Sequence, residues 1–273
     1  MIYDTFLFYN ELDLLEVRIN TLWDVVDYFV IVEATLTHQK EKKPLFFEEN
    51  KERFKKYKQK IIHVIIDDEI GCYGDIPPWR YQRDCIGRGL KQCNAEDKII
   101  LSDVDEIPSP DQVLIAEKLP QTTLFRQQLY YYFVDCRSIE LNALPWSVMF
   151  RYGDMNSPQG MRDIVTDVQA KILGGAPEGG RNDIALLDNA GWHFSYLGGV
   201  DAIIQKIEAF ADAEFNLSKF KKREEIYQSL LQGKDIYGRE LSFEFVEDAD
   251  YLPRYLRENK ERFATFFRAS LTQ

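Results

Sequence analysis

With 273 residues, the chain is long enough for one large α/β domain, or for such a domain with a helical appendage. Hydrophobic residues make up 45% and charged residues 29%, ordinary shares for a folded globular protein that exclude extensive disorder. The net charge of −11 argues against a general nucleic-acid binder, because phosphate backbones select basic surfaces.

The first hundred residues alternate strand and helix signals. Residues 5–8 are typical of a strand, and after Asn10, a predicted N-cap, apolar residues recur at spacings of three and four up to Val26. Further strands are expected over 28–32 and 61–66, with a charged helix over 48–58 between them. This alternation predicts an α/β fold, with a mostly parallel sheet covered by helices on both faces.

The middle of the chain carries an acidic turn at the end of a predicted strand. A helix is expected over 79–92, and the strand 98–101 runs straight into Asp103-Val104-Asp105-Glu106. In open α/β sheets, ligands bind where the carboxyl ends of the strands meet. The sequence therefore places a candidate binding site at residues 103–106.

The second half of the sequence is predicted to be β-rich at first, then loop-rich and finally helical. Residues 122–151 are β-rich, and residues 153–189 are predicted to be a loop-rich segment, either a lid or a plain surface excursion. One helix is expected over residues 203–210, a second is expected to begin at the basic stretch 219–223, and a last one is expected over 252–263. We therefore expect a catalytic domain over 1–198 and a helical region over 199–273 packed on the same domain.

No stretch approaches the roughly 20 apolar residues of a membrane span, and residues 1–4 lack the features of a signal peptide. We therefore expect a cytoplasmic protein without an integral membrane segment, either free or lying against the inner face of the membrane. The four cysteines form no Cys-x-x-Cys pair and are expected to be free thiols. They are Cys72, Cys85, Cys93 and Cys136.

Asp103 and Asp105 are candidate metal ligands. Residues two apart in an extended turn point to the same side, so the two carboxylates can converge on one ion. Hard oxygen ligands suit Mg²⁺ or Mn²⁺, and such an ion would neutralise a diphosphate that this acidic protein otherwise repels. The alternative is a structural turn that caps a helix beginning at Ser109.

Arg80 and Arg83 lie three apart on the predicted helix over 79–92 and therefore share one face. Arginine can hold a phosphate through two parallel hydrogen bonds. The alternative is simple helix electrostatics, in which Arg83 pairs with a neighbouring carboxylate and Arg88 pairs with Asp84.

His193 lies in a short strand-like run, 190–196, bounded by Asp188-Asn189 and by Gly198-Gly199. An ion held by Asp103 and Asp105 still lacks a protein ligand, and imidazole is acceptable to Mn²⁺. His193 is therefore a candidate third ligand, and the alternative is a histidine that is merely hydrogen-bonded in the core.

Five segments, taken in order, resemble glycosyltransferase family 17, the family of the enzymes that add bisecting N-acetylglucosamine. The resemblance implies a GT-A-like, Rossmann-like nucleotide-binding sheet and a metal-dependent reaction that inverts the anomeric carbon. It also implies a UDP-sugar donor, UDP-N-acetylglucosamine first, and a carbohydrate or glycolipid acceptor. The segments are residues 10–18, 25–33, 103–108, 190–193 and 251–256.

The resemblance also implies roles for individual residues. Asp103 and Asp105 would bind the metal and the donor, with His193 as the third metal ligand. Glu33, at a strand end, would meet the nucleotide, and Arg83 would meet phosphate with Arg80 beside it.

The proton-accepting base is the least determined part of this prediction. The resembling enzymes carry acids near the positions of Asp201 and Glu214, which makes these two residues candidates. Either of them can instead be a helix cap or a surface charge. Asp154 and Asp188 are further candidates.

Two other classes of protein compete with this interpretation. Aspartate-nucleophile phosphohydrolases also place Asp-x-Asp after a buried strand, although they need Thr or Val soon after the second Asp, where this chain has Ile107-Pro108. A non-catalytic carbohydrate-binding module is the other. The enzymes of this family that modify glycoproteins carry an N-terminal membrane anchor, which this sequence lacks. We therefore expect a bacterial or viral enzyme that acts on a polysaccharide precursor or lipid-linked sugar.

Overall fold

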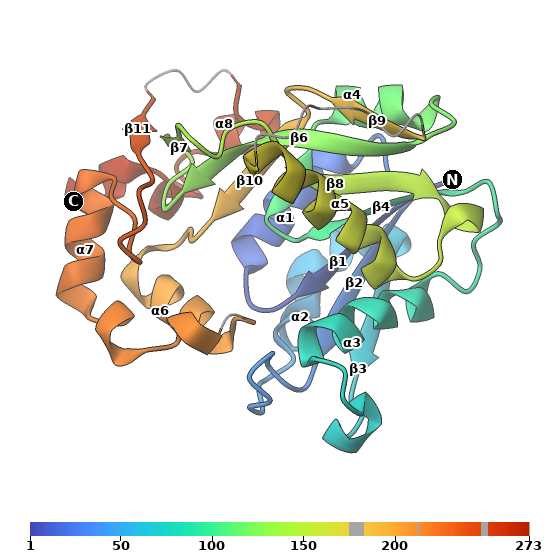
Figure 1. The fold of residues 1–273 in the computed structure, drawn as a ribbon, viewed down its shortest axis with the longest axis horizontal. Helices are drawn as coiled ribbons and strands as arrows, with labels where there is room; N and C mark the ends of the chain where they lie inside the picture. The colour runs from blue at the N-terminus through green and yellow to red at the C-terminus, as the bar shows by residue number, and fades with distance from the viewer. Residues whose placement is uncertain (175–182, 212, 247–250, 273) are drawn as a thin grey trace.

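The computed structural model describes residues 1–174, 183–211, 213–246 and 251–272. An eleven-stranded sheet forms its centre, with the main strand order β11-β7-β6-β8-β4-β1-β2-β3. Helices cover both faces of this sheet (Figure 1). The predicted α/β class, a sheet flanked by helices, is therefore confirmed.

Four neighbouring strands form the parallel part of the sheet. They are β1 (Ile2–Phe8), β2 (Tyr28–Ala34), β3 (Ile61–Ile66) and β4 (Lys98–Asp103). Because successive side chains on a strand point to opposite faces, Phe6 enters one core and Tyr3 the other.

The helices that cover these two cores come from distant parts of the chain. The core around Phe6 is closed by α1 (Leu12–Leu22), α2 (Phe46–Asn50) with the 3₁₀ segment η1 (Lys51–Lys60), and α8 (Arg254–Glu258). The core around Tyr3 is closed by η3 (Cys85–Gly89), which follows α3 (Pro78–Asp84), and by α5 (Pro158–Leu173). A short turn, η2 (Ile70–Tyr73), precedes α3.

Beyond β4 the sheet becomes mixed. β8 (Leu144–Arg151) runs antiparallel to β4 and to β6 (Thr122–Tyr131), and β7 (Cys136–Ser138) is antiparallel to β6. β9 (Ile184–Leu187) and β10 (Gly191–Ser195) both run parallel to β6. The β-rich segment predicted over 122–151 is therefore confirmed.

The acidic turn connects β4 to the short strand β5 (Glu106–Pro108). The next helix, α4 (Pro110–Glu117), is capped by the side chain of Ser109, which accepts a hydrogen bond from the backbone N–H of Gln112. The turn therefore does precede a capped helix, as the structural alternative expected, and it also ends a buried parallel strand.

The loop-rich segment predicted over 153–189 is wrong for its first half. After a short turn, η4 (Tyr152–Asp154), the chain forms the sixteen-residue helix α5. Ser157 caps this helix by accepting from the N–H of Gly160, Pro158 occupies its first turn, and Met161 and Val165 enter the core. The glycine pair 179–180 lies outside the described residues, so the lid alternative for that stretch receives no structural test.

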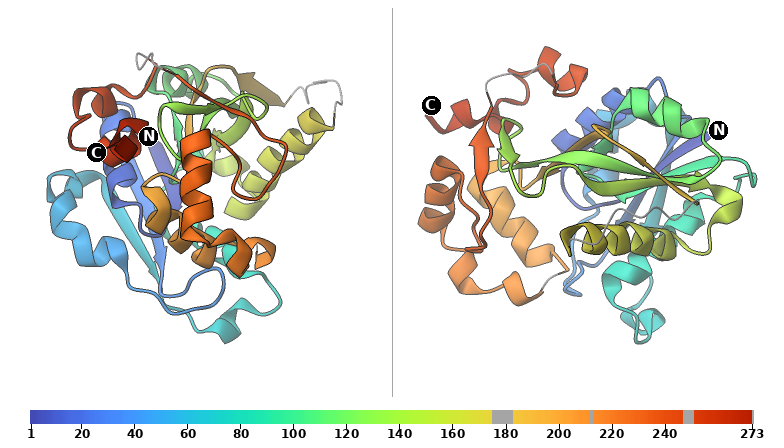
Figure 2. Two further views of the ribbon diagram at one scale, coloured as in Figure 1. Left: turned by 90° about the vertical axis from the view of Figure 1, so that its left-hand side faces the viewer. Right: turned by 45° about the horizontal axis from the view of Figure 1, so that its top comes forward.

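The C-terminal region consists of helices with one strand between them. α6 (Gly199–Ala209) and α7 (Arg223–Gln232) pack together at one end of the molecule (Figure 2), while β11 (Phe243–Phe245) pairs with β7. Short 3₁₀ turns complete it: η5 (Ala213–Phe215), η6 (Ser218–Phe220), η7 (Ala264–Phe266) and η8 (Arg268–Thr272).

Two smaller predictions can be compared with the fold. The four cysteines are free thiols, as expected. The helix expected after Asn10 starts one residue later, because Glu11 occupies the N-cap position. Across the described ranges, no helix combines the length and the apolar character needed to cross a membrane.

Candidate active site

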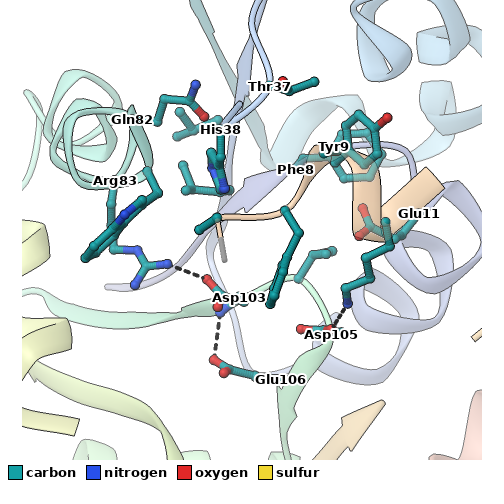
Figure 3. Close-up of a pocket in the computed structure, with 18 of the residues that line it drawn as sticks. Phe8, Tyr9, Glu11, Thr37, His38, Gln82, Arg83, Asp103, Asp105 and Glu106 are labelled. Carbon is teal, nitrogen blue, oxygen red and sulfur yellow. Dashed lines mark hydrogen bonds and ion pairs between the residues drawn. The ribbon is translucent and has the colours of Figure 1, made fainter. Parts of the chain in front are cut away.

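A cavity of about 350 Å³ opens at the carboxyl ends of β1, β2 and β4 (Figure 3). Phe8 and Tyr9 line it at the end of β1, Thr37 and His38 line it after β2, and the acidic turn lines it at the end of β4. These are the strand ends at which an open α/β sheet binds its ligands. The opposite walls come from α3, α5, β10 and α6, which contribute Trp79, Gln82, Arg83, Arg162, His193 and Lys206.

Arg18, on α1, binds the backbone of the acidic turn. Its guanidinium pairs with Asp4 through Nε and Nη2 at 2.8 and 2.6 Å, and both side chains are fully buried. Its Nη1 donates to the backbone carbonyl oxygens of Asp103, Val104 and Glu106 at 2.9, 3.2 and 2.8 Å. One side chain therefore fixes the backbone of the turn, because its rigid fork of donors reaches three carbonyl groups at once.

The carboxylate of Asp103 faces two arginines. Its Oδ1 accepts from Arg83 at 2.9 Å and its Oδ2 from Arg162 at 3.3 Å. Burial by itself would raise the pKa of Asp103, but Arg83 and Arg162 hold the pKa well below its usual range. Arg162 also makes a two-pronged ion pair with Glu106, at 2.6 Å from each carboxylate oxygen.

Asp105 faces a lysine and a histidine. The ammonium of Lys206 on α6 donates to its Oδ2 at 2.7 Å, and Nε2 of His193 lies 3.8 Å from the same oxygen. Burial would raise the pKa of Asp105, yet Lys206 and then His193 lower it overall. The carboxylates of Asp103 and Asp105 are therefore both ionised at neutral pH.

His193 reaches the turn because β10 pairs with β5, which places His193 opposite Glu106. Gly191, at φ +132°, permits this approach, since a Cβ there would overlap the carbonyl oxygen of Ile107. The imidazole packs edge-on against Trp146, with 4.3 Å between ring centroids, and its buried Nδ1 has no hydrogen-bond partner among the described residues. Burial lowers the pKa of His193, so the ring is neutral and able to bind a metal.

Four of the predicted site residues lie away from this cavity, as the structure describes it. The carboxylate of Glu33 is fully buried and accepts the N–H groups of Phe47 and Glu48 at 2.9 and 3.3 Å, so it caps α2. Arg80 pairs with Asp163 at 2.7 Å. Asp201 is exposed and pairs with Arg223, and Glu214 is exposed on η5.

The other two candidate bases are also on the surface. Asp154 pairs with Arg151 at 2.9 Å, and Asp188 pairs with Arg126 at 3.1 Å. The structure thus brings together Arg83, Asp103, Asp105 and His193, and none of the other predicted residues.

Several side chains of the cavity were not predicted from the sequence, among them the charged groups of Arg162, Lys206 and Glu11. Arg162 was missed with its helix, although the Ser157-Pro158 start and the apolar spacing of Met161, Ile164 and Val165 indicate α5. Lys206 has no local signal, because only the tertiary fold pairs it with Asp105. Glu11 lines the cavity directly after β1, and burial raises its pKa against the opposing effect of Lys206.

Comparisons with known proteins add the family. The sequence model of glycosyltransferase family 17 matches residues 1–143, just over half of the chain. The human and rat β-1,4-mannosyl-glycoprotein 4-β-N-acetylglucosaminyltransferases are each 31% identical over 145 residues, and the mouse protein is 30% identical. These alignments cover 45% of this chain but only 26% of each relative, so the match spans about a quarter of their length.

Among solved structures, 2-C-methyl-D-erythritol 4-phosphate cytidylyltransferase of Francisella tularensis aligns over 69% of this chain and 91% of its own. The TM-score is 0.34 and the sequence identity 9%.

Proposed function

Because its first 143 residues match the family's sequence model, the chain belongs to glycosyltransferase family 17, and we propose that it transfers N-acetylglucosamine from UDP-N-acetylglucosamine to a carbohydrate or glycolipid hydroxyl group. The choice of N-acetylglucosamine as the transferred sugar rests on the names of the three relatives. The observation that carries the proposal is the convergence of Asp103 and Asp105 with Arg83, Arg162 and Lys206 in one cavity at the strand ends. Such a site suits a diphosphate.

We propose that Asp103, Asp105 and His193 hold Mn²⁺ or Mg²⁺. The residues fit this role in three respects: both carboxylates are ionised, the imidazole is neutral, and its Nε2 faces an oxygen of Asp105. In the structure the described residues contain no group of three or more His, Cys, Asp or Glu side chains placed to hold a metal ion, so Asp103, Asp105 and His193 would have to draw together around it. An open site, completed by water and substrate phosphates, is what these ions prefer. When bound, the ion would neutralise the charge of the departing diphosphate.

The side chains of the cavity would carry out the remaining steps of the reaction. Arg83 and Arg162 would offset the negative charge of the UDP phosphates, and Lys206 would add a third positive charge beside them. The acceptor oxygen attacks the anomeric carbon as the bond from that carbon to UDP breaks, so the configuration inverts. Thr37, His38 and Gln82 line the same cavity and would contact the uridine.

Family membership favours this activity over an aspartate-nucleophile phosphohydrolase, and the ion pairs of Asp103 with two arginines oppose its use as a nucleophile.

We also propose a cytoplasmic location.

The test is the coupling between Mn²⁺ and UDP. Thermal unfolding of the protein is followed with UDP or UDP-N-acetylglucosamine, each with Mn²⁺ or with excess chelator. A ligand at 100 times its Kd adds about 2.7 kcal/mol to the free energy of unfolding, which is roughly 5 °C for a chain of this size. We expect this gain only with Mn²⁺ present, and we expect Asp105→Ala to abolish it.

Three results would contradict the proposal. UDP binding that is equally tight in chelator would exclude the metal role of Asp103 and Asp105. Release of phosphate from simple esters without a sugar acceptor would indicate a phosphohydrolase. Sugar binding that needs neither UDP nor Mn²⁺ would indicate a non-catalytic module.

A further inference from the structure

A second cavity, of about 310 Å³, adjoins the first on the side of α6. Four residues line both cavities: Glu11, Asp105, Tyr196 and Lys206. The two spaces therefore meet at the Asp105–Lys206 ion pair, next to the end of the acidic turn.

The second cavity has the mixed lining that a saccharide needs. Asn10 and Gln205 present amide groups, hydrogen-bonded to each other at 3.1 Å, and Asp13 and Arg53 add charged groups. Apolar surface lies beside these polar groups, as sugar rings require for their C–H faces. It comes from Leu12, Phe194, Leu197 and Phe266.

Glu11 stands where the two cavities meet. It follows β1 and occupies the N-cap position of α1, so two regular elements fix its backbone. Its Oε2 accepts the N–H of Asn10 at 3.0 Å, and in the described part of the chain no side chain donates a hydrogen bond to its carboxylate. Figure 3 places Glu11 near Asp105, on the side of the cavity away from Arg83.

Glu11 also differs from the other carboxylates of the first cavity in its charged partners. Asp103, Asp105 and Glu106 are each paired with an arginine or a lysine at 3.3 Å or less. Among the described residues Glu11 forms no ion pair. A carboxylate held by a cation is a poor proton acceptor, so Glu11 is the acid of the cavity best suited to take a proton.

We propose that Glu11 is the general base of the transfer and that the second cavity holds the saccharide whose hydroxyl group it deprotonates. This inference rests on the proposed glycosyltransferase activity. It replaces Asp201, Glu214, Asp154 and Asp188, none of which lines either cavity within the described ranges.

The step balances as a single displacement. The carboxylate of Glu11 takes the proton of the acceptor hydroxyl, and the acceptor oxygen forms a bond to the anomeric carbon. The bond between that carbon and the diphosphate oxygen breaks, and UDP leaves with its electron pair. The proton then passes from Glu11 to solvent, and the carboxylate is restored.

The experiment uses water as the acceptor, because the saccharide is unidentified. Release of UDP from UDP-N-acetylglucosamine and Mn²⁺ is measured for the wild type, Glu11→Gln and Glu11→Ala, each with and without sodium azide. We expect both variants to lose about 100-fold or more of the hydrolysis rate while binding UDP with a similar Kd. Azide carries no proton to remove, so it should restore UDP release in the variants and yield the glycosyl azide.

The matched control is Glu117→Gln on the exposed face of α4, which should behave as the wild type does. Hydrolysis by Glu11→Gln and Glu11→Ala at the wild-type rate would overturn the assignment. So would lost hydrolysis that azide fails to restore in variants that still bind UDP, since this would mark Glu11 as structural. A wild type that binds neither UDP nor UDP-N-acetylglucosamine would instead refute the glycosyltransferase proposal, and the role of Glu11 with it.

Discussion

Replacing Arg18 should separate the stability of the fold from the shape of the active site. Arg18→Met removes the partner of Asp4, whose side chain is completely buried, and leaves the carbonyl oxygens of Asp103, Val104 and Glu106 without their donor. Breaking a buried ion pair from one side costs about 3–5 kcal/mol. At about 2 °C per kcal/mol for a chain of this size, the Tm should fall by roughly 6–10 °C.

The double variant Asp4→Val/Arg18→Met isolates the second role of Arg18. Replacing both partners of a buried pair by apolar side chains is often nearly neutral, so the double variant should regain most of the lost stability. Its acidic turn still lacks the three hydrogen bonds from Nη1, which together position Asp103 and Asp105. We therefore expect UDP to bind about 10-fold more weakly in the presence of Mn²⁺, the equivalent of one such hydrogen bond.

The assay combines thermal unfolding by circular dichroism with titration calorimetry of UDP, for the wild type, both single variants and the double variant. Melting of Arg18→Met within about 2 °C of the wild type would show that the buried pair contributes little to stability. UDP binding by the double variant as tight as that of the wild type would show that the hydrogen bonds from Nη1 do not position the turn.

Three other variants probe the site. Arg83→Ala should weaken UDP binding by about 10- to 100-fold in calorimetry but leave uridine binding nearly unchanged, because the lost contact is to phosphate; equal losses for both ligands would exclude that role. His193→Ala should raise the Mn²⁺ concentration needed for half-maximal UDP binding, whereas an equal gain in Tm from Mn²⁺ plus UDP in mutant and wild type would show that His193 is structural. Burial, reinforced by Arg83, lowers the pKa of His38 to about 4, so the folded protein binds fewer protons than the unfolded chain between about pH 6.5 and 4 and loses stability as the pH falls. His38→Gln should flatten the pH dependence of Tm in that window, and an unchanged slope would contradict the shifted pKa.

Local patterns in the sequence were sufficient to predict the strands and the acidic turn of the N-terminal half. The apolar runs that became β2 and β4 are continuous because these parallel strands are buried on both faces, and this pattern is visible without any partner. The acidic turn could be located for the same reason, since it directly follows such a run. Helix α5 also has readable start signals, but the glycines that follow it in the sequence, from residue 174 to residue 180, favour a loop and obscure them.

Tertiary structure decided which charges surround the turn. Arg162 and Glu106 are 56 positions apart, and Lys206 and Asp105 are 101 apart, so no helical or strand spacing connects either pair. Glu33 shows the converse: its place at a strand end suggested a ligand contact, but the fold turned its carboxylate onto the N–H groups of α2. The identity of the acidic turn is therefore a local property of the sequence. Its partners and its second cavity exist only once α5, β10 and α6 pack against the strand ends, because burial and charge pairing depend on distances in space.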